Sequence, residues 1–222
     1  MKRGALAAVL MVSLAGAQVV AGAPGLLLSG EYARAYDAAR AADDPLTASR
    51  AAAAQAEYRA GGTLWVTRAV ESGRQASREQ PHNADAALAL GSALGLQARA
   101  GGYTLGALKT AHEARAALDR ALALAPGRPD LQAVLAEWHA GAWARARMFS
   151  GGNPERARTL ALGAARAAPD TVFVQAHAGL ALALLRDPQA RAVLARAAAL
   201  NADSALDHDV QAQARQALGT LK

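Results

Sequence analysis

The segment ARAALDRALALAPGRPD, residues 114–130, contains the end of one helix and the start of the next. Alanine and leucine are strong helix formers, whereas Pro126 ends a helix because it has no amide hydrogen and restricts the residue before it. A second run rich in alanine and leucine begins directly after Asp130. The segment therefore predicts two long helices joined by a short turn.

Proline follows an alanine-rich run at three other places, Pro45, Pro81 and Pro169, and another such run comes after each of them. The 222-residue chain is 53% hydrophobic but only 4% aromatic, so the residues that favour strands are scarce. These observations predict an all-α fold of antiparallel helix pairs, in which small side chains let the helices approach closely.

Small and large residues recur at a fixed spacing in the two helices that flank residues 99–106. The pattern is Ala87-x2-Leu90-Gly91-x2-Leu94 in the first helix and Ala114-x3-Leu118-x2-Ala121-x4-Pro126 in the second. It resembles the tetratricopeptide repeat, whose first helix carries Leu-Gly between large residues and whose second helix ends on proline. In such a pair, Gly91, Ala114 and Ala121 would let the helices approach while large residues fill the groove.

Weaker copies of the pattern follow along the chain. They are Gln132-x2-Leu135-Ala136-x2-His139 with Ala157-x3-Ala161-x2-Ala164-x4-Pro169, and Gln175-x2-Ala178-Gly179-x2-Leu182 with Ala190-x3-Leu194-x2-Ala197. The resemblance covers about residues 48–202. It implies a right-handed α-solenoid of antiparallel helix pairs, built from four to five degenerate repeats.

The spacing of the prolines departs from the usual repeat. The intervals from Pro81 to Pro126 and from Pro126 to Pro169 are 45 and 43 residues, against about 34 in the family. The additional residues lie in two glycine-containing segments, residues 99–106 and 149–155. We therefore expect lengthened helices joined by flexible turns.

Three further helix boundaries are predicted from the sequence. Asn153 is a suitable N-cap, with Pro154 as the first helical residue. Pro45 is expected to close an early half-unit of the array. Residues 203–222 are expected to form a terminal capping helix with charged outer positions.

Residues 1–23, MKRGALAAVLMVSLAGAQVVAGA, have the pattern of a cleaved export signal. Lys2 and Arg3 precede an apolar run, and small residues suit cleavage after either Ala17 or Ala23. This pattern predicts a periplasmic or secreted protein.

The predicted domains are thus a signal peptide at residues 1–23 and a helical repeat domain at residues 24–222. After cleavage, we expect no stable membrane span. The alternative is a retained anchor, because residues 18–28 could extend the apolar run towards the ~20 residues that a membrane span needs.

Charge and cysteine content restrict the possible functions. The formal net charge of +6 falls to +4 without Lys2 and Arg3. The arginines are spread among acidic residues and do not alternate with aromatic ones, which argues against nucleic-acid binding. The chain has no cysteine, so disulfides, thiolate metal sites and cysteine nucleophiles are excluded.

The segment LAEWHAGAW, residues 135–143, holds two of the three tryptophans. His139 takes the place of a packing residue of the repeat, and it shares a helix face with Trp143 four residues later. Trp138 is expected to fill space left by alanines of the following helix. Trp138, His139 and Trp143 are the predicted aromatic pocket.

The sequence contains no recognisable catalytic or metal-binding pattern. HEARA at residues 112–116 lacks the second histidine of a zinc-protease helix. GSALG at residues 91–95 lies on a predicted helix and not at the strand-to-helix turn of a nucleophile elbow. The prediction is a protein that is not an enzyme and uses no cofactor or metal.

In the family that the sequence resembles, exposed positions of each first helix line a concave groove. The corresponding positions here are Asp85, Leu88, Ser92, Asp130, Ala133, Glu137, Phe173, Ala176, His177 and Leu180. The resemblance implies a protein or peptide partner in this groove. Together with the export signal, it predicts a non-catalytic protein-interaction or scaffolding module of the bacterial cell envelope. The alternative is a periplasmic carrier of a small apolar ligand, with Trp138, Trp143 and Phe173 as pocket walls.

Overall fold

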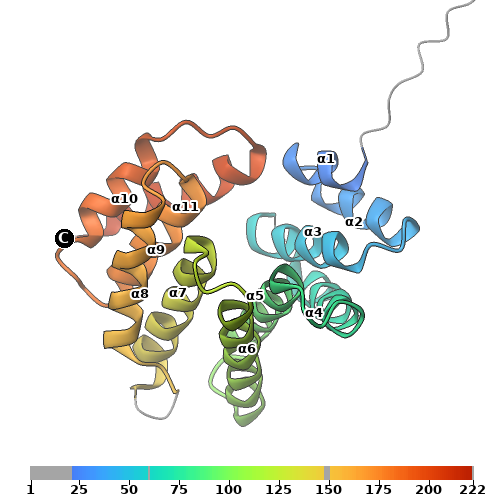
Figure 1. Cartoon of the computed structure of the whole chain (residues 1–222), viewed down its shortest axis with the longest axis horizontal. Helices are drawn as coiled ribbons and strands as arrows, with labels where there is room; N and C mark the ends of the chain where they lie inside the picture. Colours follow the sequence, from blue (N-terminus) through green and yellow to red (C-terminus); the bar gives the residue numbers. More distant parts are fainter. Residues whose placement is uncertain (1–21, 60, 148–150, 222) are drawn as a thin grey trace, which may run out of the picture.

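The computed structural model describes residues 22–59, 61–147 and 151–221. In these ranges the chain forms eleven α-helices and no strand (Figure 1). The helices are α1 (Ala23–Leu28), α2 (Tyr32–Ala41), α3 (Pro45–Tyr58), α4 (Gly62–Glu79), α5 (Ala84–Ala100), α6 (Leu105–Leu124), α7 (Pro129–Ala146), α8 (Pro154–Ala167), α9 (Val172–Leu184), α10 (Ala190–Ala199) and α11 (Ala205–Thr220). The prediction of an all-α fold is confirmed.

Helices that follow one another in the chain pack side by side, which confirms the predicted packing of neighbouring helix pairs. Contacts also join α3 to α5, α7 to α9 and α9 to α11, so alternate helices form an inner layer. Figure 1 shows α4, α6, α8 and α10 on the outer side of this layer. The inner helices α5 and α7 scarcely touch each other, although both line the cavity described below.

Polar side chains begin five of the helices. Each N-cap oxygen accepts a hydrogen bond from a backbone N–H of the first turn, which satisfies a group that the helix itself leaves without a partner. The N-cap residues are Asp44, Asn83, Thr104, Asn153 and Ser204. The predicted start of α8 is confirmed, since Asn153 Oδ1 lies 2.9 Å from the backbone nitrogen of Arg156.

Prolines mark helix ends and helix starts. The helices α4, α6 and α8 each end two residues before a proline, at Pro81, Pro126 and Pro169. Pro45 has a different role from the predicted one, because it is the first residue of α3 and follows the N-cap Asp44. A proline fits there since the first helical amide has no partner within the helix.

Two glycines allow paired helices to come into contact. A Cβ atom at Gly91 of α5 would lie 2.7 Å from Leu118 Cδ2 of α6. A Cβ atom at Gly179 of α9 would lie at the same distance from Leu194 Cδ2 of α10. Any larger residue at either position would push the two helices apart.

Two buried glutamines repeat one hydrogen-bonding arrangement. The amide nitrogen of Gln175 donates to two carbonyl groups at the end of α8, at 2.7 and 3.0 Å. The amide nitrogen of Gln211 donates in the same way to two carbonyl groups at the end of α10, at 3.0 and 2.7 Å. Each glutamine thus satisfies backbone acceptors that the preceding helix leaves free.

The N-terminal helices close against α11. Asp209 of α11 accepts a hydrogen bond from the hydroxyl of Tyr32 in α2 and forms an ion pair of 2.8 Å with Arg59. Gln213 of α11 donates to Glu57 of α3 at 3.2 Å. Figure 1 shows α11 near α1, so the row of helices curves back towards its own start. The helix α11 is therefore more than the predicted terminal cap, because some of its polar side chains face the N-terminal helices.

In the described part of the chain, no helix is both long enough and apolar enough to cross a bilayer. Residues 1–21 lie outside the described residues. Ala17 lies among them, whereas Ala23 is the first residue of α1. The export signal, its two cleavage sites and the anchor alternative stay predictions.

Candidate functional site

A cavity of about 1750 Å³ lies between the inner helices. Side chains of α3, α5, α7, α9 and α11 line most of it, and α6 with the turn before it completes one side. Its larger apolar lining residues include Leu88, Leu96, Leu108, Val134, Trp138, Phe173, Leu180 and Leu184. Ligand pockets commonly measure ~300–1,000 Å³, so this space could hold a small molecule of considerable size.

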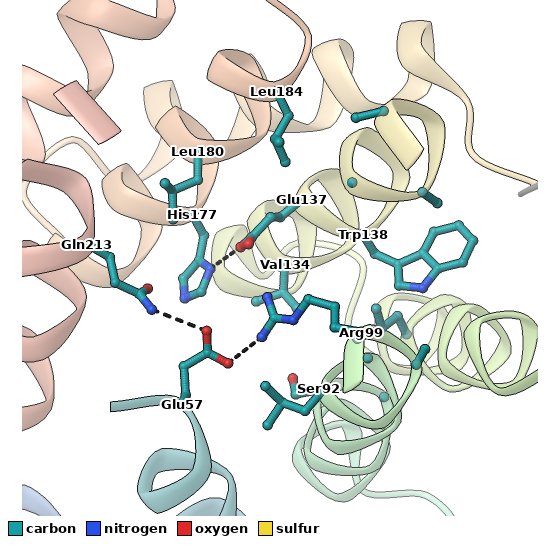
Figure 2. Close-up of a pocket in the computed structure, with 18 of the residues that line it drawn as sticks. Glu57, Ser92, Arg99, Val134, Glu137, Trp138, His177, Leu180, Leu184 and Gln213 are labelled. Carbon is teal, nitrogen blue, oxygen red and sulfur yellow. Dashed lines mark hydrogen bonds and ion pairs between the residues drawn. The ribbon is translucent and has the colours of Figure 1, made fainter. Parts of the chain in front are cut away.

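Five polar side chains, one from each inner helix, meet in this cavity and are called the polar cluster below. They are Glu57 of α3, Arg99 of α5, Glu137 of α7, His177 of α9 and Gln213 of α11. Figure 2 shows that Arg99 and Gln213 both reach Glu57, while Glu137 and His177 point towards each other. The distance from His177 Nδ1 to Glu137 Oε2 is 2.5 Å.

The periodicity of the α-helix places these polar side chains on the same helix face as apolar ones. Residues three or four apart share a helix face. On α9 these residues are Phe173, His177, Leu180 and Leu184, and on α7 they are Val134, Glu137, Trp138 and Gly141. Each polar group of these two helices therefore lies within an apolar stripe.

Glu137 is an ionised carboxylate in a largely buried position, with 23% of its side chain exposed. Burial by itself would raise the pKa of Glu137. His177, through its positive charge when it is protonated and through its hydrogen bond, and Arg99, through its charge, outweigh that effect and hold the pKa of Glu137 below its ordinary value. The carboxylate thus keeps its negative charge inside the cavity at neutral pH.

Tyr58 lines the cavity next to the polar cluster. Burial and the nearby negative charges of Glu57 and Glu137 raise the pKa of Tyr58 above its ordinary value. Its phenol therefore remains protonated and can donate a hydrogen bond. Negative charge from Glu57 and Glu137 thus lies close to the phenol, in addition to the effect of burial.

His177 has one nitrogen engaged and one without a partner. Its Nδ1 faces Glu137, whereas its Nε2 is buried and has no hydrogen-bond partner. A neutral imidazole that donates from Nδ1 presents Nε2 as an acceptor. The ring of Phe173 lies 4.2 Å from the imidazole, measured between centroids, and supports its orientation.

The structure places five of the six predicted groove residues along the cavity, namely Ser92, Asp130, Glu137, Phe173 and His177. Asp85 does not line it, and instead forms ion pairs with Arg50 at 2.6 Å and Arg128 at 3.0 Å. Of the other positions carried over from the family, Leu88 and Leu180 also line the cavity, whereas Ala133 and Ala176 are fully buried in the core.

The predicted aromatic pocket of Trp138, His139 and Trp143 does not form a shared lining. Of these three, only Trp138 borders the cavity, and it packs on a cluster from α3 to α6 that includes Leu94, not on the alanines of the following helix. His139 is fully buried. The guanidinium carbon of Arg147 lies over the Trp143 ring, 5.5 Å from its centroid.

Sequence reasoning missed Glu57, Tyr58, Arg99 and Gln213. Their partners are distant along the chain: Arg99 is 42 positions after Glu57, and Gln213 is 156 positions after it. Glu57 and Arg99 lie near helix ends, where charged residues are common on solvated surfaces. No motif at these positions distinguishes them from surface residues.

Within the described ranges, no group of three or more histidine, aspartate or glutamate side chains is arranged to hold a metal ion. The polar cluster offers hydrogen-bond acceptors and one guanidinium, and the neighbouring Tyr58 adds a phenol, in a mostly apolar space. This chemistry suits recognition of a polar group on an apolar molecule. Comparisons with protein-family models and with curated proteins find no match to the chain.

Proposed function

We propose that this chain is a non-catalytic binding protein that holds a small amphipathic molecule in its central cavity. This corresponds to the carrier alternative raised by the sequence. The observation that carries the proposal is a large apolar cavity with a compact polar cluster in its wall. Apolar walls with a few convergent polar groups are the usual composition of small-molecule sites.

The contacts of α11 with the N-terminal helices favour a small ligand over an extended protein partner. Hydrogen bonds join Glu57 to Gln213 and Arg59 to Asp209, so the first and last inner helices meet. A groove for a peptide would need that side to be free. The residues expected in such a groove instead surround a space bounded by helices on several sides.

We also propose that the helix pairs are degenerate tetratricopeptide-like repeats of a right-handed α-solenoid. The close approaches at Gly91 and Gly179 fall on matching positions of the repeat pattern, which supports the proposal. The matching contacts of Gln175 and Gln211 support it independently. Export to the bacterial envelope belongs to the same proposal and depends on the pattern of residues 1–23.

Filling the cavity tests the proposed function. Gly95 lines the cavity on α5, and a Cβ atom there would meet no atom within 4 Å. The variant Gly95→Trp should therefore fold, because replacing glycine inside a helix favours the helix. We expect its affinity for the neutral dye Nile red, measured by fluorescence titration, to fall at least tenfold while its melting temperature does not fall.

Gly219→Trp is the matched control. Gly219 is also helical and free of neighbours within 4 Å, but it is exposed and does not line the cavity. This variant should bind Nile red as the wild-type protein does. Equal affinity of the Gly95→Trp and wild-type proteins, or no saturable binding by the wild type, would contradict the proposal.

A further inference from the structure

We propose that the ligand carries a protonated amine on an apolar body, and that the amine binds between Glu137 and His177. This inference rests on the proposed function, since it names the ligand class of the same cavity. The argument uses the charge of the polar cluster, its free hydrogen-bonding atoms and its aromatic neighbours.

The polar cluster has more negative than positive charge when His177 is neutral. Glu57 and Arg99 neutralise each other in an ion pair. Glu137 is the second carboxylate, and among the described residues its hydrogen-bond partner is the imidazole of His177. Other carboxylates of the cavity lining already have guanidinium partners, as Asp130 does with Arg128 and Asp187 with Arg158. With a neutral His177, the Glu137 carboxylate therefore has no cationic partner of its own, and a cationic ligand can balance its charge.

The free atoms of the cluster are acceptors. Glu137 Oε2 faces His177 Nδ1, which leaves the second carboxylate oxygen of Glu137 available. His177 Nε2 has no partner and is an acceptor in the tautomer that donates from Nδ1. An ammonium group has three donors and a positive charge, so it suits a site with these two acceptors. A hydroxyl group has a single donor, and a carboxylate ligand would be repelled by Glu137.

Aromatic rings next to the cluster add to this preference. Phe173 lies against His177, and Tyr58 lines the cavity near the carboxylates of Glu57 and Glu137. Cations bind favourably to the faces of such rings. Besides Arg99, the arginines of the cavity lining are Arg50, Arg145, Arg186 and Arg191, and all four are exposed, so water screens their repulsion of a cation inside.

The size of the cavity requires more than a small amine. A volume of about 1750 Å³ exceeds what a simple ammonium ion could fill. The apolar side chains around the cluster, Leu88, Val134, Leu180 and Leu184 among them, would exclude water around a hydrocarbon body. A long-chain or polycyclic amine fits both parts of the site.

Three probes of equal chain length test the inference on the wild-type protein by isothermal titration calorimetry at neutral pH: decylammonium chloride, 1-decanol and sodium decanoate. We expect decylammonium to bind at least tenfold more tightly than 1-decanol, and decanoate to bind most weakly. Equal or tighter binding of 1-decanol or decanoate would overturn the inference and leave the proposed function standing. No binding of any probe or of Nile red would contradict the proposed function itself.

The variant Glu137→Gln tests whether Glu137 causes the preference for decylammonium over 1-decanol. Its decylammonium affinity should fall about tenfold towards that of 1-decanol, while its 1-decanol affinity should stay the same. Glu113→Gln is the matched control, because Glu113 pairs with Arg74 on the outer surface of α6, away from the cavity. An unchanged preference in a folded Glu137→Gln protein would overturn the assignment, and the wild-type comparison decides the ligand class if that variant does not fold.

Discussion

His139 is fully buried on α7, and neither nitrogen of its imidazole has a hydrogen-bond partner. Burial, together with the positive charges of Arg156 and Arg115, lowers the pKa of His139 from 6.5 to about 4. The folded protein therefore resists protonation at this position, whereas the unfolded chain accepts a proton near pH 6.5. The contribution of His139 to stability must fall as the pH decreases from about 6.5 to about 4.

The variant His139→Phe removes this dependence. A pKa change from 6.5 to about 4 makes the wild type about 2 kcal/mol less stable at pH 5 than at pH 8 through His139 alone. We expect the difference in unfolding free energy between the Phe variant and the wild type to rise by that amount between the two pH values. Urea denaturation at pH 5 and pH 8 measures it.

His82→Phe is the control for this comparison, because His82 is exposed in the turn before α5. The control should show no such dependence on pH. If the difference in unfolding free energy between His139→Phe and the wild type is the same at pH 5 and pH 8, the imidazole of His139 is not held neutral by burial.

The sequence already indicated a packing role for His139, because it falls on a position of the repeat pattern that a large residue usually occupies. The sequence could not indicate that both nitrogens of His139 lack hydrogen-bond partners.

At the scale of the helices, local chemistry explains why much of the fold could be predicted. Alanine and leucine runs, prolines and an Asn-Pro start act within a few residues, and the helix ends near Pro81, Pro126 and Pro169 follow from them. The small residue at Gly91 was also predictable, since the repeat pattern pairs it with a large residue in the next helix. The role of Pro45 was not, because a proline between two helices can follow the first or begin the second.

Two glycines of α5 allow a direct test of helix contact. Alanine normally stabilises a helix by about 0.5–1 kcal/mol relative to glycine. Gly95→Ala should show this gain, since its Cβ atom would meet nothing within 4 Å. Gly91→Ala should instead destabilise by about 1–3 kcal/mol, because its Cβ atom would lie 2.7 Å from Leu118. Urea unfolding of both variants gives the two signs, and a gain at Gly91 would show that α5 and α6 do not pack this closely.

At the scale of the whole molecule, the cavity forms because the angles between successive helices add up until α11 meets the N-terminal helices. The packing of any one pair of helices does not determine this sum. The polar cluster joins residues of five helices, and its contact between Glu57 and Gln213 links positions 156 residues apart. A pattern with a period of one repeat predicts neighbouring contacts well, but it does not predict whether the last helix meets the first. For this reason the sequence led to several cavity residues while missing Glu57, Arg99 and Gln213.

Removing the carboxylate of Asp209 should separate α11 from the N-terminal helices. Tyr32 is almost completely buried, and the Asp209 carboxylate accepts its hydroxyl hydrogen and pairs with Arg59. Asp209→Ala would leave the tyrosine hydroxyl without its acceptor, at a cost of about 1–3 kcal/mol. We expect a larger radius of gyration in small-angle X-ray scattering and a several-fold weaker affinity for Nile red. Asp203→Ala, at an exposed position before α11, should change neither. If Asp209→Ala loses stability but keeps its radius of gyration and its affinity, the contacts between α11 and the N-terminal helices stabilise the protein without shaping the cavity.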